Sequence, residues 1–222
     1  MNEQREVIYA ERLQVLNGEN MRDVIMKMLN DIVEGAVDMS IGDEQSADKW
    51  NFKELNELIL PIIPLKPLEL NDEIRHMKKD ELKHALKEKA TKFYEAKEAE
   101  FPDAEQIREI ERVVLLKVID NKWMSHIDDM DQLRQGIGLQ AYGQRDPLVE
   151  YKMSGYEMFE DMSSAIREDT VRILCHIRVE QKIEREAAAR VTGTNRDNTA
   201  ARTPQRRAAQ KIYPKILSLR IR

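Results

Sequence analysis

The residues that could carry out chemistry in this chain are few and widely spaced. His126 and Asp129 stand three apart in the run HIDDMD at residues 126–131, a spacing that places both side chains on one helix face. A zinc site needs three or four such ligands, and no second His or Cys lies near them in the sequence. We therefore predict a solvated acidic face here and no bound metal.

The other reactive side chains also lack partners. Cys175 is the only cysteine, so it cannot form an internal disulfide, and its apolar setting VRILCHIRV predicts a buried, unreactive thiol. No Ser–His–Asp or Cys–His arrangement indicates an activated nucleophile. Nothing matches the phosphate-binding patterns G-x-x-x-x-G-K-[ST] or G-x-G-x-x-G. We therefore expect no catalysis, no ATP hydrolysis and no cofactor in this chain by itself.

Composition narrows the class of protein further. Charged residues make up 35 % of the 222 residues, hydrophobic residues 41 % and aromatic residues 5 %, and clusters typical of strands are rare. These proportions predict an all-α protein of one large or two small domains. No apolar run reaches the roughly 18 residues of a membrane span, and the first residues are too charged for a signal peptide. We expect a cytoplasmic protein.

The charge is distributed unevenly along the chain. Residues 191–222 hold eight Lys or Arg residues and one Asp, whereas the whole chain has a formal net charge of −5. Residues 186–222 also lack apolar periodicity, so we predict a disordered basic tail. Such a tail would contact anionic membrane surfaces weakly, and we expect no specific nucleic-acid binding.

Two apolar stripes predict the elements that must position any functional residue. One steps by three or four residues through Leu116, Ile119, Trp123, Ile127, Met130, Leu133 and Ile137. The other runs through Tyr151, Gly155, Phe159, Met162, Ile166, Thr170, Ile173 and Ile177. Each stripe is one helix face, and the short connection makes the helices antiparallel neighbours. We predict that the core of this hairpin contains Trp123, Ile127, Met130, Phe159 and Met162.

The first hundred residues predict further helices. Residues 3–40 read as one long helix, or two nearly continuous ones with a kink at 17–20. One helix face of this segment carries residues at gaps of four and three: Met21, Ile25, Met28, Ile32, Gly35 and Met39. A short helix around 51–60 and a compact loop pinned by Pro61, Pro64 and Pro67 should follow, with Trp50 and Phe52 as core anchors. A charged helix at 71–100 should be capped by Asn71.

The connection inside the hairpin carries more than a turn requires. Gly136, Gly138 and Gly143 weaken helix there, while Asp146-Pro147 is suited to restarting one. Tyr142 lies among these glycines. Its ring either folds back on the hairpin or stands exposed on a loop that a rigid scaffold presents, which is a common place for function.

Three stretches resemble a known family. Residues 115–159, LLKVIDNKWMSHIDDMDQLRQGIGLQAYGQRDPLVEYKMSGYEMF, resemble the two-helix finger of SecA, the ATPase motor of bacterial preprotein export. The segment VIYAERLQVLNGENMRDVIMKML resembles the start of its long scaffold helix, and the proline-rich region falls where SecA inserts its helical wing. The resemblance covers about residues 1–185. It implies a scaffold helix at 1–40, a wing domain at 41–105 and a scaffold two-helix finger at 106–185, before the tail.

The resemblance implies a role in transport. SecA moves unfolded preproteins through the SecY/SecE/SecG channel, with its finger at the channel mouth and its scaffold regulating the motor domains. ATP and Mg belong to those motor domains, whose motifs are missing here, and the family's cysteine-rich zinc motif is replaced by YPKILSLRIR. The implied polypeptide- and channel-contacting residues form the finger tip, with Tyr142 as the family's tip tyrosine: Leu139, Gln140, Ala141, Tyr142, Gly143, Gln144 and Arg145. The implied location is the inner face of the plasma membrane.

Two other classes of function are weighed against this one. A free-standing helical adaptor, which binds a partner helix and has no motor, fits the same helical pattern. The eleven methionines suit either adaptable core filling or such a contact surface. An enzyme is the third class, and no sequence feature supports it.

Overall fold

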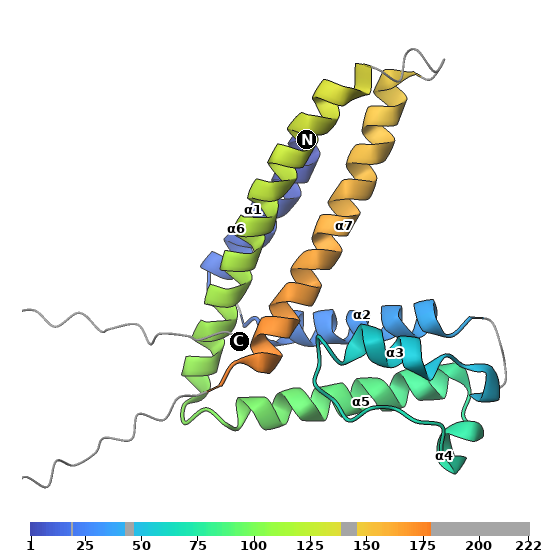
Figure 1. Ribbon diagram of the computed structural model, residues 1–222. Helices are drawn as coiled ribbons and strands as arrows, with labels where there is room; N and C mark the ends of the chain where they lie inside the picture. The colour runs from blue at the N-terminus through green and yellow to red at the C-terminus, as the bar shows by residue number, and fades with distance from the viewer. Residues whose placement is uncertain (19, 43–46, 139–145, 179–222) are drawn as a thin grey trace, which may run out of the picture. The chain divides into compact units, whose positions relative to one another are not determined.

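A computed structural model describes residues 1–18, 20–42, 47–138 and 146–178. Within these ranges the chain forms seven α-helices and a short 3₁₀ helix, η1 (Ala47–Lys49), without a strand (Figure 1). The predicted all-α class is confirmed. The helices belong to one compact unit that spans residues 1–177.

The predicted kink in the first segment is a break between two helices. α1 (Asn2–Leu16) and α2 (Arg22–Ser40) are separated by residues 17–21. Gly18 has a φ of 77°, a left-handed conformation that glycine adopts without a Cβ clash. The side-chain oxygen of Asn20 accepts a hydrogen bond from the backbone N–H of Arg22 (3.1 Å), which satisfies one donor of the first turn of α2.

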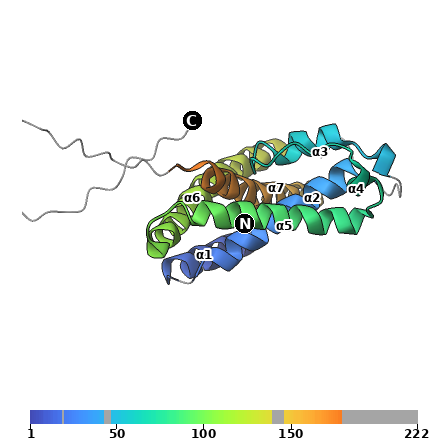
Figure 2. The ribbon, with the colours of Figure 1, turned by 90° about the horizontal axis from the view of Figure 1, so that it is seen from below.

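The buried face of α2 agrees with the predicted apolar face only in part. Its buried residues are Ile25, Leu29, Val33, Ala36, Val37 and Ser40, whereas Met39 is 73 % exposed and Gly35 is also exposed. α2 contacts α3 (Phe52–Ile59), α5 (Lys79–Glu98) and α7 (Pro147–His176), which lie near it in Figures 1 and 2. These contacts cover a face centred on the aliphatic row. Of the predicted row, Met21 and Ile25 are buried, and Met28 and Ile32 pack partly buried against the core.

The proline-rich segment forms the predicted apolar loop after α3. Asn51 caps α3 by accepting a hydrogen bond from the N–H of Glu54 (3.1 Å). Asn56 then makes two hydrogen bonds of 2.8 Å to the backbone of Leu68, one as donor and one as acceptor. Trp50 is buried with its ring centroid 6.1 Å from that of Phe52, so the predicted anchors meet.

The charged segment after residue 71 is interrupted, which the sequence pattern did not indicate. Asn71 caps only the short α4 (Asp72–Arg75), accepting from the N–H of Ile74 (2.8 Å). α5 begins after residue 78, whose backbone N–H donates to the carboxylate of Glu81 (2.8 Å). Lysines of α5 pair with acids of α2, and Asp38 accepts from both Lys79 and Lys83 (2.8 and 2.7 Å). These hydrogen bonds hold the pKa of the Asp38 carboxyl below its usual value.

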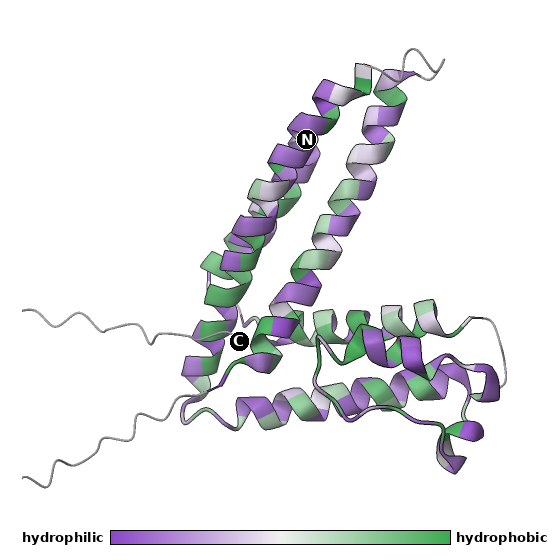
Figure 3. Cartoon of the chain, viewed as in Figure 1, coloured by the Kyte–Doolittle hydropathy of each residue, from purple (hydrophilic) through white to green (hydrophobic). Residues whose placement is uncertain are grey.

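The predicted hairpin is formed by α6 (Ala104–Gly136) and α7, which run side by side in Figure 1. Asp103 caps α6 by accepting from the N–H of Glu105 (3.0 Å), and Asp146 caps α7 in the same way through Leu148 (2.9 Å). The residue after Asp146 is proline, whose fixed φ suits a first helical turn. Hydrophilic and hydrophobic residues recur along both helices (Figure 3). No described residue of either predicted stripe is exposed.

Candidate functional site

The α6–α7 hairpin is the candidate functional site, because it carries the predicted finger tip. The tip, residues 139–145, lies outside the described residues. Of the predicted hairpin core, Trp123, Met130 and Met162 are buried, while Ile127 and Phe159 are half-buried and pack against the central core.

The two arms come close where Gly155 of α7 faces Met130 of α6. A Cβ atom at residue 155 would lie 2.9 Å from the terminal methyl carbon of Met130, so the absence of a side chain allows the close approach. Towards the other end of the hairpin, Lys122 and Asp169 form an ion pair between the arms (2.6 Å).

His126 is buried, which corrects one prediction from the sequence. The run HIDDMD was predicted to be a solvated acidic face, and Asp128 and Asp129 are exposed as expected. The His126 side chain is only 3 % exposed, with ring centroids 5.6 Å from Trp123 and 5.8 Å from Phe159. Burial lowers the pKa of this imidazole, although the nearby charge of Asp129 opposes the shift. His126 faces the core, while Asp129 lies on the solvent-exposed edge of the same side of the helix.

No described group could hold a metal ion: residues 1–18, 20–42, 47–138 and 146–178 contain no cluster of three His, Cys, Asp or Glu side chains with suitable positions. Cys175 is 2 % exposed, and its burial raises the pKa of the thiol to about 12. The predicted buried, unreactive cysteine is therefore supported by both its exposure and its acidity.

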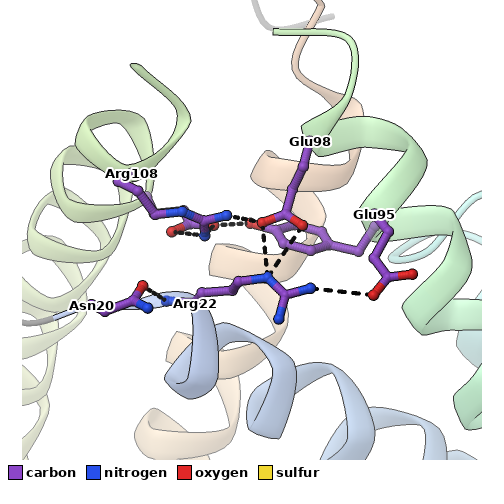
Figure 4. A network of polar contacts seen from close by, with 7 residues as sticks. Asn20, Arg22, Glu95, Glu98 and Arg108 are labelled. Atoms are coloured by element: carbon purple, nitrogen blue, oxygen red, sulfur yellow. Dashed lines mark hydrogen bonds and ion pairs between the residues drawn. The ribbon is translucent and has the colours of Figure 1, made fainter. Parts of the chain in front are cut away.

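The base of the hairpin is held by a charge network around one buried glutamate, which the sequence did not predict (Figure 4). Glu111 of α6 has no exposed surface. Its carboxylate accepts a hydrogen bond from the hydroxyl of Tyr94 (2.5 Å) and two from Arg108 (2.6 and 2.7 Å). A buried carboxylate without such partners would destabilise the fold strongly. Burial, followed by the negative charge of Glu111, raises the pKa of the Tyr94 hydroxyl, which therefore stays protonated as the donor.

The network extends to a third helix. Arg108 also pairs with Glu98 at the end of α5. The same carboxylate accepts from Nε of Arg22, in the first turn of α2 (3.2 and 3.3 Å), and Arg22 reaches Glu95 (3.3 Å). Figure 4 shows the two guanidinium groups converging on Glu98. α2, α5 and α6 are thus joined at the base of the hairpin.

One sequence signal could have revealed this network. Glu111 lies four residues after Ile107 and three before Val114, and both neighbours are buried on the same face of α6. A glutamate within an apolar stripe indicates a buried charge that needs a partner. Arg108, three residues earlier on the same helix, is a partner that spacing offers, whereas Tyr94 could not be read from spacing because it belongs to another helix.

The outer arm of the hairpin, residues 131–138 and 146–154, is built differently. None of its side chains is buried. Several of its apolar side chains face solvent instead: Leu148 (61 % exposed), Val149 (50 %) and Met153 (56 %), followed by Tyr156 (64 %) one turn later on α7. Val149, Met153 and Tyr156 are spaced four and three residues apart, so they share one helix face.

Comparison with known proteins gives the family. The model of the SecA wing and scaffold domain matches residues 1–178. The chain belongs to the SecA family. It is 65 % identical over 214 residues to the protein translocase subunit SecA of Lachnoclostridium phytofermentans, covering 96 % of this chain and 25 % of that protein. It is 42 % identical over 214 residues to the protein translocase subunit SecA of Clostridium novyi, covering 96 % and 26 % of the two chains.

These matches establish the family of this SecA chain but cover only part of its relatives. It spans about a quarter of the length of the relatives it matches. The resemblance carried by the hairpin and the first helix is confirmed as family membership. No helix within the described part of the chain is long and apolar enough to cross a membrane. The domain limits at 1–40, 41–105, 106–185 and 186–222 stay predictions, as do the tip residues.

Proposed function

We propose that this chain is the wing and scaffold part of an ATP-driven protein translocase, and that its hairpin is a two-helix finger. The relatives at 65 % and 42 % identity are named protein translocase subunit SecA, which supports the general role. The observation that carries the finger itself is the hairpin's construction. At one end, α6 is tied to α5 and α2 through a charge network around the buried Glu111. At the other end, α7 exposes Leu148, Val149 and Met153 to solvent.

The proposed work of this finger is mechanical. Polypeptide in transit presents varied sequences, so a gripping surface must bind side chains and backbone without reading them. Tyr142 suits this task, since an aromatic ring makes apolar and stacking contacts with many partners. The neighbouring exposed row of Val149, Met153 and Tyr156 would add apolar contact along the arm. The partners would be the unfolded preprotein and the SecY/SecE/SecG channel.

ATP hydrolysis would belong to the motor domains of the same protein, which would hold ATP and Mg. We propose that this chain transmits their movement to the finger and restrains them when idle. Its place would be the cytoplasm, peripherally at the inner face of the plasma membrane, with the basic tail near anionic lipid. No zinc is proposed for this chain, because the tail holds no cysteine.

The test is preprotein translocation by the full-length motor with substitutions at Tyr142. Tyr142→Phe should keep transport, because the face and edge of the ring remain, whereas Tyr142→Ala and Tyr142→Asp should abolish most of it. Each substitution should change the free energy of unfolding by no more than about 0.5 kcal/mol, as is usual for surface residues, and thermal melting measures this. Tyr9→Ala, which removes an exposed ring from α1 and not from the arm, is the control and should keep transport. Full transport by Tyr142→Ala would remove this residue from the mechanism.

A second measurement separates the motor part from an adaptor. The purified chain should show no Mg-dependent ATP hydrolysis, and added to a motor that lacks this region it should change the motor's basal ATPase rate. A chain that leaves this rate unchanged at every concentration would favour the free-standing adaptor.

A further inference from the structure

Gln4 of α1 makes hydrogen-bonding contacts with both arms of the hairpin. Its side-chain Nε2 donates to the backbone carbonyl of Gly155 on α7 (2.8 Å). Its Oε1 lies 3.3 Å from Nε2 of His126 on α6. A single amide therefore bridges the two helices of the hairpin, which the Lys122–Asp169 ion pair also joins farther along.

The direction of these bonds fixes the proton on His126. Because the amide nitrogen of Gln4 donates to a carbonyl, its oxygen must be the atom that faces the imidazole, and an amide oxygen can only accept. Nε2 of His126 must then carry the hydrogen. Burial lowers the pKa of this ring, so it is neutral near pH 7 with its proton on Nε2.

Close packing around Gly155 and His126 fixes where Gln4 can make its two hydrogen bonds. Gly155 lacks the side chain that would meet Met130 at 2.9 Å, so the arms are close together where Gln4 reaches them. The His126 ring is enclosed by Trp123 and Phe159 (centroids at 5.6 and 5.8 Å). The packing therefore restrains both the Gly155 carbonyl and the His126 ring, so neither can follow Gln4 if it is displaced.

α1 has a second, weaker tie to the hairpin. Arg12 pairs with Asp120 of α6 at 2.9 Å, and both side chains are about half exposed (45 % and 50 %). An exposed ion pair is screened by water and salt and contributes little. It also touches α6 alone, so it cannot fix where α7 lies.

We infer that Gln4 is a positioning residue, which sets the placement of both arms of the finger against α1. Neither arm can slide along α1 without breaking one bond of the same amide, so a movement of α1 is passed to the two arms together. This inference depends on the proposed function in one respect, which is that the outer end of the hairpin is the end that contacts polypeptide. The geometry can be tested without transport.

Three variants of the full chain separate the two bonds. Gln4→Met keeps a similar length and removes both bonds. Gln4→Glu keeps an acceptor for His126 but loses the donor to Gly155. Gln14→Met is the matched control, because Gln14 is an exposed glutamine on the same helix. Circular dichroism and melting establish that each variant is folded.

Spin-label distances report arm position, with label pairs at Glu6 and Lys152 (α1 to α7) and at Glu6 and Asp128 (α1 to α6), all exposed. In a Cys175→Ala background, Gln4→Met should broaden both distance distributions. Gln4→Glu should broaden mainly the α7 distance, and Gln14→Met should broaden neither. Distributions that Gln4→Met leaves as narrow as the parent's overturn the inference.

Nitrogen NMR of the His126 ring provides a readout that general loosening would not imitate. The parent should show the Nε2–H tautomer with a pKa below the ordinary value of about 6.5. Gln4→Glu should raise that pKa, because a carboxylate at this position favours the imidazolium. A parent ring protonated on Nδ1, or a pKa that Gln4→Glu does not move, overturns the bridge. A failure of the Tyr142 transport experiment would leave both readouts unaffected, so the two proposals can fail separately.

Discussion

The base and the outer arm of the hairpin are made from the same two helices but are held in opposite ways. At the base, a fully buried glutamate is bound by a tyrosine and an arginine, and three helices meet around it. In the outer arm no side chain is buried, and apolar residues such as Met153 face solvent. Buried contacts are therefore concentrated at one end, and the other end is the contact surface that we propose. Four measurements can break or sharpen this contrast.

The largest expected difference is in thiol reactivity. Cys175 near the base should react with a thiol reagent at pH 8 at least on the order of 10³-fold more slowly than a free thiol, because burial raises its pKa to about 12. A cysteine placed in the outer arm, Met153→Cys with Cys175→Ala, should react like an exposed thiol. Comparable rates for the two cysteines would show that the base opens readily.

Trp123→Ala should destabilise the chain the most among single truncations. The side chain is 7 % exposed within the hairpin, and removing a buried aromatic typically costs about 3–5 kcal/mol. The neighbouring Met124 is 61 % exposed, so Met124→Ala is a matched control that should cost less than about 0.5 kcal/mol. Urea unfolding of both variants gives the comparison. Equal, small losses would mean that Trp123 serves a contact outside this chain.

Tyr94→Phe should cost about 1–3 kcal/mol at neutral pH, because buried Glu111 loses a donor. The difference should shrink in alkali. The raised pKa of Tyr94 keeps its proton in the folded state, while the unfolded chain loses it above about pH 10. Wild-type stability should therefore fall relative to the variant by about 1.4 kcal/mol per pH unit above that point.

The control for this pH dependence is Tyr156→Phe, which alters an exposed tyrosine on α7. Its stability should run parallel to the wild type from pH 7 to 11. A constant gap between wild type and Tyr94→Phe over the same range would show that the hydroxyl of Tyr94 reaches solvent when it ionises.

The smallest effect is expected in the outer arm. Met153→Ala should change the free energy of unfolding by no more than about 0.5 kcal/mol, since the side chain is 56 % exposed and leaves no cavity. Calorimetric melting is sufficient to measure it. A loss as large as that of Trp123→Ala would mean that the outer arm is packed as tightly as the inner part, and the contrast would fail.

Much of the hairpin could be predicted because its signals are local. The apolar spacing along residues 116–177 indicated two helices, and Asp146-Pro147 marked where the second begins. The break near Gly18 was also visible, because a glycine inside a helical pattern weakens it. The apolar spacing was a poorer guide to burial on α2, where two neighbouring rows of apolar residues could each face the core. There it favoured the row that ends at Met39, of which Ile25 is buried but Met39 is exposed, while the structure also buries Leu29 and Val33 beside that row.

What the sequence determined alone is therefore the helices, their caps and the two-arm hairpin, because spacing and capping depend on residues within a few positions of one another. Tertiary structure alone decided which polar groups of different helices meet. Tyr94 and Glu111 pair across two helices, and Gln4 reaches two arms far along the chain. These choices follow from how helix faces are oriented against each other, and a buried polar group must take whatever partner that packing brings within reach.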